Sequence, residues 1–357
     1  MASTSQQPSG LWTLLTAAIT IVTLLFGSLL IQPRLTERRV KINDRYILTP
    51  VEVEALPSGV LAAVLDRRTG EDENAFNYRL LKLVLERSGS SYVLGLSAAI
   101  QPQDEAVSAL VHGDDPSRNP LRITVGVYGA GKELNRRLQS VPIPVAGGIL
   151  GLRVGWSNRY DVPLLKTVDD VADLRSILLL QGLGWSDVAI FDTSGLHTYT
   201  ARSEDLFRLV DNRRVQLFPR GIAELEDEYQ VVRSVTTNTV LDPHLLIAYP
   251  FAGFFYVGPD QQALANAIQT GFERAINDGS YQKLLEEIIF TPWLKKNLRL
   301  EDRSIIVLSN PSASEVLADV NPKHWIVPWG SLLNGSIKKG EKLCELAQFQ
   351  KLFPQKI

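Results

Sequence analysis

Two apolar segments interrupted by proline and glycine constrain the fold of this chain more than any other feature. They span residues 141–155 (VPIPVAGGILGLRVG) and 245–258 (LLIAYPFAGFFYVG). Proline and glycine end or bend regular strands, so each segment is typical of a connection between two structural units. Because there are two such connections, we expect the chain to leave a first unit, build a second one and then return.

Short apolar runs alternate with amphipathic helical patterns along most of the chain. Residues 60–65 (VLAAVL) predict a buried strand, and residues 75–86 (AFNYRLLKLVLE) predict a helix because their apolar side chains recur every three or four positions. The same alternation continues from residue 162 to residue 244. Alternating strands and helices favour mostly parallel sheets covered by helices, so the predicted fold class is α/β with two lobes.

The predicted division of the chain follows its connections. At 357 residues, of which 45% are hydrophobic, the chain is long enough to bury two cores. A short amphipathic helix near residues 343–349 is expected to dock on lobe 1, or alternatively on a membrane or a partner. The expected parts are an anchor and linker at residues 1–39, lobe 1 at 40–157, lobe 2 at 158–244, the return to lobe 1 at 245–330, and a C-terminal tail at 331–357.

Residues 11–31 form an apolar stretch that contains no charged residue. A helix of this length rises 1.5 Å per residue and is about 30 Å long, which matches the thickness of a bilayer core. The stretch is longer than the apolar part of a secretory signal, and no good cleavage site precedes Thr36. We therefore expect an uncleaved transmembrane anchor, with a cleaved signal as the alternative.

The charges that flank this stretch point to the opposite orientation from export. No Lys or Arg precedes residue 11, whereas Arg34, Arg38 and Arg39 follow the stretch. The positive-inside rule, taken alone, places the following domain in the cytoplasm, but the rule weakens when that domain is long. The expectation of export therefore depends on the resemblance described below.

Composition and motifs exclude several classes of function. A net charge of −2 without a basic run gives no indication of nucleic-acid binding. The one cysteine, Cys344, excludes an internal disulfide and a cysteine-based metal cluster. The histidines are scattered, and the chain has no G-x-S-x-G elbow, no P-loop and no complete G-x-G-x-x-G. We expect neither a catalytic residue, nor a metal, nor a cofactor, and so no enzyme.

Five stretches carry a resemblance to a known family. They are QGLGWSDVAIFDTSGL (181–196), SEDLF (203–207), FPRGIAE (218–224), YPFAGFFYVG (249–258) and LANAIQTGFERAINDGSYQKLL (264–285). In this order they resemble the type II periplasmic solute-binding proteins, in particular the polar amino-acid (family 3) proteins of ABC transporters. The resemblance covers roughly residues 60–329.

The resemblance implies a protein outside the cytoplasm that captures an amino acid or a small carboxylate when its two lobes close. It also implies a partner in the membrane, either an ABC permease or a sensor. In that family an arginine shortly before the first crossover clamps the ligand carboxylate, and Arg136 and Arg137 lie near that place. The alternative is a membrane-anchored scaffold or sensor subunit of the same fold that has lost solute binding.

Two loops of lobe 2 are candidates for ligand binding, because ligands of open α/β sheets bind where strands lead into helices. In the first loop, Gly182 and Gly184 allow backbone N–H groups to approach an anion at a helix start. The alternative is an ordinary strand–helix turn. In the second, Arg220 stands at a helix start, where the helix dipole disfavours a cation. It therefore needs a partner, which is either a ligand carboxylate or Glu224 one turn later.

Three aromatic residues complete the predicted ligand-binding set. Trp185 follows the glycine loop and either lines the ligand site or packs inside the lobe. Tyr78 lies at the start of the first helix, with the same two alternatives. Tyr249 lies in the second connection, where it serves either as a hinge residue or as a stacking surface for the ligand.

Overall fold

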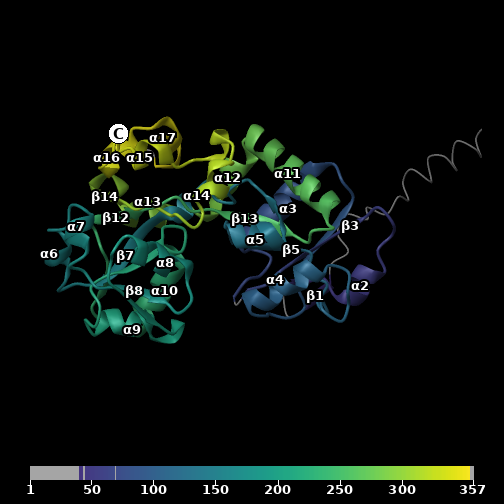
Figure 1. Cartoon of the computed structure of the whole chain (residues 1–357), viewed down its shortest axis with the longest axis horizontal. Coiled ribbons are helices and arrows are strands. Elements are labelled where there is room, and N and C mark those ends of the chain that lie inside the picture. The colour runs from purple at the N-terminus through teal and green to yellow at the C-terminus, as the bar shows by residue number, and fades with distance from the viewer. Residues whose placement is uncertain (1–39, 43–44, 69, 354–357) are drawn as a thin grey trace, which may run out of the picture.

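Two separate β-sheets organise the part of the chain that the computed structural model describes, which is residues 40–42, 45–68 and 70–353 (Figure 1). The first sheet has seven strands, in the order β1 (Val40–Ile42), β2 (Arg45–Ile47), β4 (Tyr92–Leu96), β3 (Leu61–Leu65), β5 (Val125–Gly129), β13 (Gly253–Val257) and β6 (Gln139–Val141). Within it, β3 runs parallel to β4 and β5, whereas β13 is antiparallel to β5 and β6.

The second sheet is built around a different set of strands. Its order is β10 (Phe218–Gly221), β7 (Leu152–Asn158), β12 (Leu245–Ala248) and β14 (Ser304–Val307), with β11 (Thr239–Leu241) also paired to β7. The parallel pair β8 (Leu179–Gly182) and β9 (Thr198–Ala201) adjoins it through a bridge between Leu179 and Leu217. The strand predicted at residues 60–65, which is β3, therefore lies in a different sheet from β8, as a two-unit α/β fold requires.

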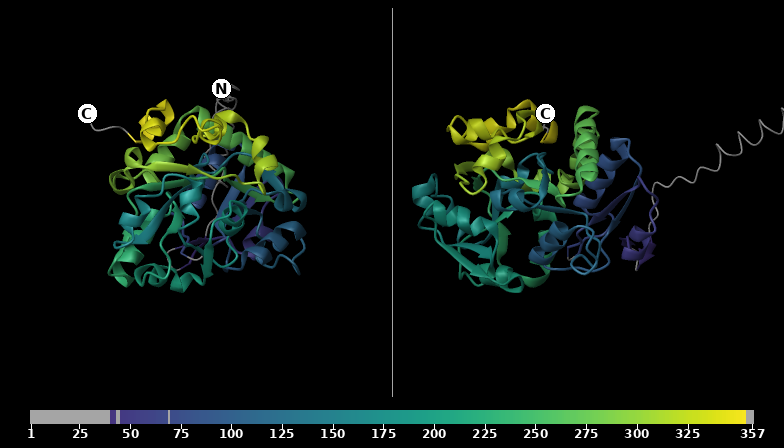
Figure 2. Two further views of the ribbon diagram at one scale, coloured as in Figure 1. Left: turned by 60° about the vertical axis from the view of Figure 1, so that its left-hand side comes forward. Right: turned by 45° about the vertical axis from the view of Figure 1, so that its right-hand side comes forward.

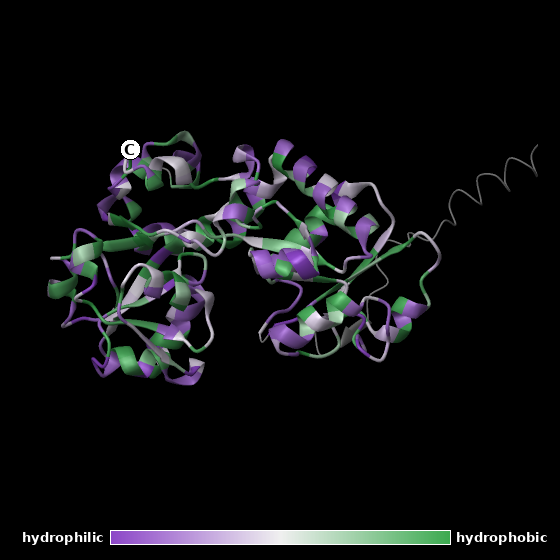
Figure 3. Cartoon of the chain, in the orientation of Figure 1, coloured by the Kyte–Doolittle hydropathy of each residue, from purple (hydrophilic) through white to green (hydrophobic). Residues whose placement is uncertain are grey.

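Helices cover both sheets and keep the apolar strands out of water. Figure 3 shows hydrophobic strands inside each unit and hydrophilic residues gathered on the surrounding helices. In the first unit these are α2 (Pro50–Glu54), α3 (Phe76–Ser88), α4 (Gln103–His112), α5 (Lys132–Arg137), α11 (Gln262–Asn277) and α12 (Ser280–Ile288). In the second they are α6 (Val162–Leu165), α7 (Val171–Leu174), α8 (Ser186–Thr193), α9 (Leu206–Asp211), α10 (Leu225–Val235) and α13 (Pro292–Leu298).

The two predicted connections join the units. The first runs from β6 to β7, and the second runs from β12 to β13. Gly148 in the first connection adopts a left-handed backbone conformation, with φ of 87°. A Cβ atom at this position would lie 2.7 Å from the Trp325 ring and 2.8 Å from the Trp329 ring, so only glycine fits there.

The C-terminal segment corrects the predicted division. Residues 245–330 do not all return to the first lobe, because β12 and β14 pair in parallel within the second sheet. The segment then crosses to the first unit, where Val316 and Leu317 of α14 (Ser314–Ala318) pack in one cluster with Phe254 and Tyr256 of β13. The sequence does not predict this path, because the pattern of a four-residue strand such as SIIV does not indicate which strand it pairs with.

The C-terminal tail also differs from its prediction. It forms α15 (Trp329–Leu333), α16 (Gly340–Cys344) and α17 (Ala347–Leu352). We expected it to dock on the first lobe. Instead, the backbone N–H of Gly340 donates to the carbonyl oxygen of Arg303, and Ser304 forms a β-bridge with Lys339. Helix α16 therefore lies against the edge of the second sheet. Figure 2 shows these helices along one side of the second unit.

The predicted membrane helix at residues 11–31 lies outside the described residues. Among the residues that are described, no helix is both long enough and apolar enough to cross a bilayer.

Arg303 offers a test of the pairing between β14 and β12. Its buried guanidinium donates to the carbonyl oxygens of Leu298, Asp242 and Leu245 at 2.6, 2.8 and 2.8 Å. Burial lowers the pKa of Arg303 to about 10, and the Asp242 carboxylate lies 3.9 Å away. Replacing Arg303 with Met leaves that carboxylate buried without a cation. We expect this to lower the free energy of unfolding by about 3–5 kcal/mol in urea titrations.

Arg208→Met is the matched control, because Arg208 is exposed and pairs with Asp205 on the surface. It should change stability much less. Equal effects of the two substitutions would show that Arg303 does not hold β14 in place.

Candidate functional site

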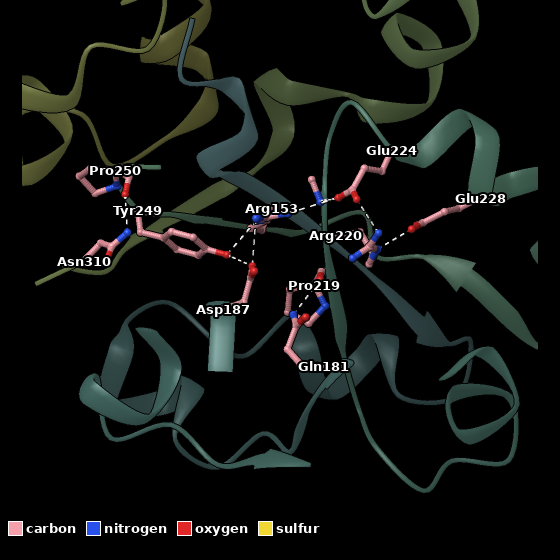
Figure 4. A network of polar contacts seen from close by, with 11 residues as sticks. Arg153, Gln181, Asp187, Pro219, Arg220, Glu224, Glu228, Tyr249, Pro250 and Asn310 are labelled. Carbon is pink, nitrogen blue, oxygen red and sulfur yellow. Dashed lines mark hydrogen bonds and ion pairs between the residues drawn. The ribbon is translucent and has the colours of Figure 1, made fainter. Parts of the chain in front are cut away.

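A buried network of ion pairs occupies the second unit where the two connections meet it (Figure 4). We call it the second-unit network, and Arg153 is its centre. This residue lies on β7, directly after the first connection. Its Nε donates to the Tyr249 hydroxyl at 2.8 Å, and its Nη2 lies 3.0 Å from Oδ1 of Asp187. The Tyr249 hydroxyl also donates to Asp187. The two connections are therefore tied together through one guanidinium.

The network continues to a second arginine. Nη1 of Arg153 lies 3.3 Å from Oε2 of Glu224, and the other oxygen of Glu224 accepts from Arg220 at 2.6 Å. Arg220 also pairs with Glu228, and Glu228 accepts from the Trp156 ring nitrogen at 2.8 Å. The network thus links β7, β10 and the second connection to the first turns of α8 and α10.

Burial and charge act in opposite directions within the network. Burial alone would lower the pKa of Arg153, but Tyr249, Asp187 and Glu224 raise it overall, so its guanidinium stays charged. For Arg220 burial is likewise outweighed by Glu224 and Glu228, and the net pKa is raised. The pKa of Glu228 is raised, mainly because it is buried. The buried cations are therefore compensated by carboxylates of the same unit.

Arg220 has the internal partner that the sequence offered as its alternative. Its contacts with Glu224 and Glu228, and with the Trp185 ring at 4.5 Å, occupy the guanidinium within the second unit. The expectation that Arg220 pairs with a ligand anion is corrected accordingly. The physical reason is that α10 carries two carboxylates one turn apart on the face that meets β10.

The glycine loop has a packing role at one of its two positions. A Cβ atom on Gly182 would lie 2.3 Å from the Trp185 ring, so the glycine makes room for that ring, which also stacks on Phe218. Gly184 has a φ of 77° and nothing within 4 Å of where a Cβ would stand. It supplies the left-handed turn into α8, and anion binding there stays a prediction.

The remaining predicted residues do not gather at one place. Tyr78 is 1% exposed and belongs to the core of the first unit, so its predicted contact with ligand is corrected to packing. Arg136 and Arg137 are exposed at the end of α5, where Arg136 pairs with Glu133 at 3.4 Å. Of this set, Tyr249 alone lies in the network.

A second polar group, which the sequence patterns did not predict, lies at the carboxyl edge of the first sheet. We call it the first-unit edge. Asp66 follows β3, and its Oδ2 accepts from the Tyr128 hydroxyl of β5 at 3.0 Å. The Arg68 guanidinium lies 6.0 Å from the centre of the Tyr128 ring and donates to the Val127 carbonyl. The charged triplet Asp66–Arg68, directly after a buried strand, was the signal available in the sequence.

Asp66 is a buried carboxylate of the first unit. It is 6% exposed, and its Oδ1 has no hydrogen-bond partner among the described residues. Burial raises its pKa, although the Tyr128 hydrogen bond and the charge of Arg68 act against that rise. A buried carboxylate with an unused acceptor is costly. It also lies at the edge of a parallel sheet, where ligands of such folds bind.

Phe251, in the second connection, lies beside the end of β5 and beside the second-unit network. Its ring is 3.1 Å from where a Cβ on Gly129, the last residue of β5, would stand. The Arg153 guanidinium of the second-unit network lies 5.4 Å from the centre of the same ring. In the described part of the chain, no His, Cys, Asp and Glu side chains are grouped to hold a metal ion.

Comparisons with known proteins give structural similarities only. No family model and no curated relative matches the chain. A putative binding component of an ABC transporter from Wolinella succinogenes, complexed with lysine, is 15% identical with a TM-score of 0.46, over 66% of this chain and 98% of that one. An amino acid ABC transporter substrate-binding protein from Streptococcus pneumoniae, bound to L-arginine, is 12% identical with a TM-score of 0.44, over 65% and 94%.

An ancestral amino acid-binding protein, described as a precursor of cyclohexadienyl dehydratase, is 14% identical with a TM-score of 0.44, over 65% of this chain and 95% of that one. These structures are of the class that the sequence resembles. Their identities and TM-scores are too low for their ligands to be carried over to this chain.

The internal role of Arg220 can be tested through its carboxylate partners. Replacing Arg220 with Met leaves Glu224 and Glu228 facing each other without a shared cation. The free energy of unfolding should fall by about 3 kcal/mol in urea titrations. Adding Glu228→Gln should restore part of the loss, because Gln is neutral and still accepts from Trp156. A small effect of Arg220→Met alone would mean that the pairing contributes little.

The buried charge of Asp66 should make the free energy of unfolding depend on pH. Replacing it with Asn removes the charge and keeps an acceptor for Tyr128, so the free energy of unfolding should rise at pH 7.5. The folded protein protonates Asp66 before the unfolded chain does, because its pKa is raised. On acidification the wild type therefore gains stability relative to Asp66→Asn. The difference between their free energies of unfolding should be smaller at pH 4 than at pH 7.5. Asp104→Asn on the exposed start of α4 is the control, and a destabilised Asp66→Asn at pH 7.5 would contradict the argument.

Proposed function

We propose that this chain is a solute-binding protein that holds a small charged molecule between its two units without a chemical step. The observation that carries the proposal is the buried carboxylate of Asp66, whose Oδ1 has no partner among the described residues. Leaving such an oxygen without a donor costs free energy, and a ligand that donates to it would recover that cost. The place of Asp66, at the carboxyl edge of parallel strands, supports a ligand as the donor.

The charges at the first-unit edge define the ligand. Asp66 offers an acceptor for an ammonium group, and the exposed Arg68 offers a planar guanidinium for a carboxylate. A molecule that carries both groups a few atoms apart is amino-acid-like. Phe251 and the second-unit network, across the second connection, supply the wall that would close over it when the units approach.

The cellular setting of the proposal rests on the apolar N-terminal stretch together with the family resemblance. An apolar stretch at residues 11–31 would hold the two units at the outer face of a membrane. The described units contain neither a permease nor a signalling domain, so delivery of the solute would need a membrane partner, such as an ABC permease or a sensor. Membrane placement and partner are part of the proposal.

One observation favours a second candidate, a scaffold or sensor subunit that binds no solute. Asp187 and Glu224 place the chain's own carboxylates at the starts of α8 and α10. These are the positions where an anion would gain from the helix dipoles. Because Arg153 and Arg220 neutralise them, this face of the second unit is satisfied without a ligand.

A thermal-shift screen of the full chain against single amino acids and small carboxylates separates the two candidates. A ligand at 100 times its Kd should add about 2.7 kcal/mol of stability. The response should disappear in Asp66→Asn, which removes the acceptor, and persist in the control Asp104→Asn. If no compound stabilises the wild type beyond Asp66→Asn, solute binding at this edge is refuted and the scaffold candidate is favoured.

A further inference from the structure

A cavity of about 490 Å³ lies in the second unit, between α10, α13, β7 and β11. Its volume is within the range of pockets that hold small molecules. Its walls include neither the first-unit edge nor Arg153, and it meets the second-unit network only at Trp156, whose ring nitrogen donates to Glu228. The cavity therefore has no part in the proposed binding between the two units.

Aromatic rings supply much of the cavity wall. Trp156 of β7, Tyr229 of α10 and Trp293 of α13 all line it. The Tyr229 and Trp293 rings form a tilted pair with centroids 4.9 Å apart. Val232 and Leu241 add aliphatic surface. Such walls favour a flat apolar body, because rings stack on rings and burial removes apolar area from water.

The charge on the lining of the cavity is positive. Arg233, in the last turn of α10, lines the cavity with its guanidinium 5.6 Å from the centre of the Tyr229 ring. None of the residues that line the cavity is acidic, and Thr237 and Asn297 are among its polar members. Arg233 is exposed, so its cation can approach a ligand at the mouth without a large desolvation cost.

We propose that this cavity is a second binding site, for a molecule with a flat aromatic body and an anionic group, such as an aromatic carboxylate. The body packs against Tyr229 and Trp293, whose side chains are partly exposed. The anion pairs with Arg233 through a charge-assisted hydrogen bond, and the absence of lining carboxylates disfavours a cationic analogue. The site is independent of Asp66 and of the ligand proposed there.

The test is calorimetric titration of the full chain with 2-naphthoate and with 2-naphthylmethylammonium, which has the same ring system but the opposite charge. We expect one saturable site for 2-naphthoate and at least tenfold weaker binding of the cation. Arg233→Gln should weaken 2-naphthoate binding roughly tenfold to a hundredfold, since it removes a hydrogen bond to a charged group. Trp293→Ala should also weaken it.

Two controls keep the outcome specific. Arg202→Gln, which removes an exposed arginine elsewhere in the same unit, should leave 2-naphthoate binding unchanged. Asp66→Asn should also leave it unchanged, so failure of the inter-unit site and failure of this one are distinguishable. The proposal is overturned if 2-naphthoate shows no saturable binding, if Arg233→Gln binds as the wild type does, or if Arg202→Gln weakens binding equally.

Discussion

The rest of the structure depends on the hydrogen bonds and ion pairs of the buried Arg153 guanidinium. It lies where the chain enters the second unit and bonds to Tyr249, where the chain leaves it. Taking a charge out of water costs several kcal/mol, so the guanidinium is tolerated only with its partners in place. Asp187 and Glu224 provide them from the first turns of α8 and α10. Sheet, helices and both connections are thereby held in one arrangement.

The two polar groups differ in how fully they are satisfied. In the second-unit network each arginine has carboxylate partners, so the network stabilises the unit without outside help. At the first-unit edge, Asp66 keeps one oxygen unused while its charge is buried. In the proposed binding between the units, the first unit therefore supplies the charged acceptor, and the second-unit network forms the opposite wall.

The C-terminal segment braces the two units against each other. It extends the second sheet through β14 and packs α14 into a core of the first unit. Lys323 pairs with Glu273 of α11, and the backbone N–H of Ile326 donates to Gly147 in the first connection. Bending at that connection would therefore also move the C-terminal segment.

The sequence by itself determined the two-unit α/β plan, including both connections and the helix predicted at residues 75–86 and observed at Phe76–Ser88, because periodic burial and chain-breaking residues are local properties. Only the tertiary structure decided which polar groups meet. Tyr128 reaches Asp66 across 62 residues, and β14 reaches β12 across a similar stretch of chain. From the sequence, Arg220 could pair with either a ligand carboxylate or Glu224. The packing of α10 on β10 selected Glu224 and added Glu228. Such pairings depend on which strands lie side by side, which local patterns do not encode.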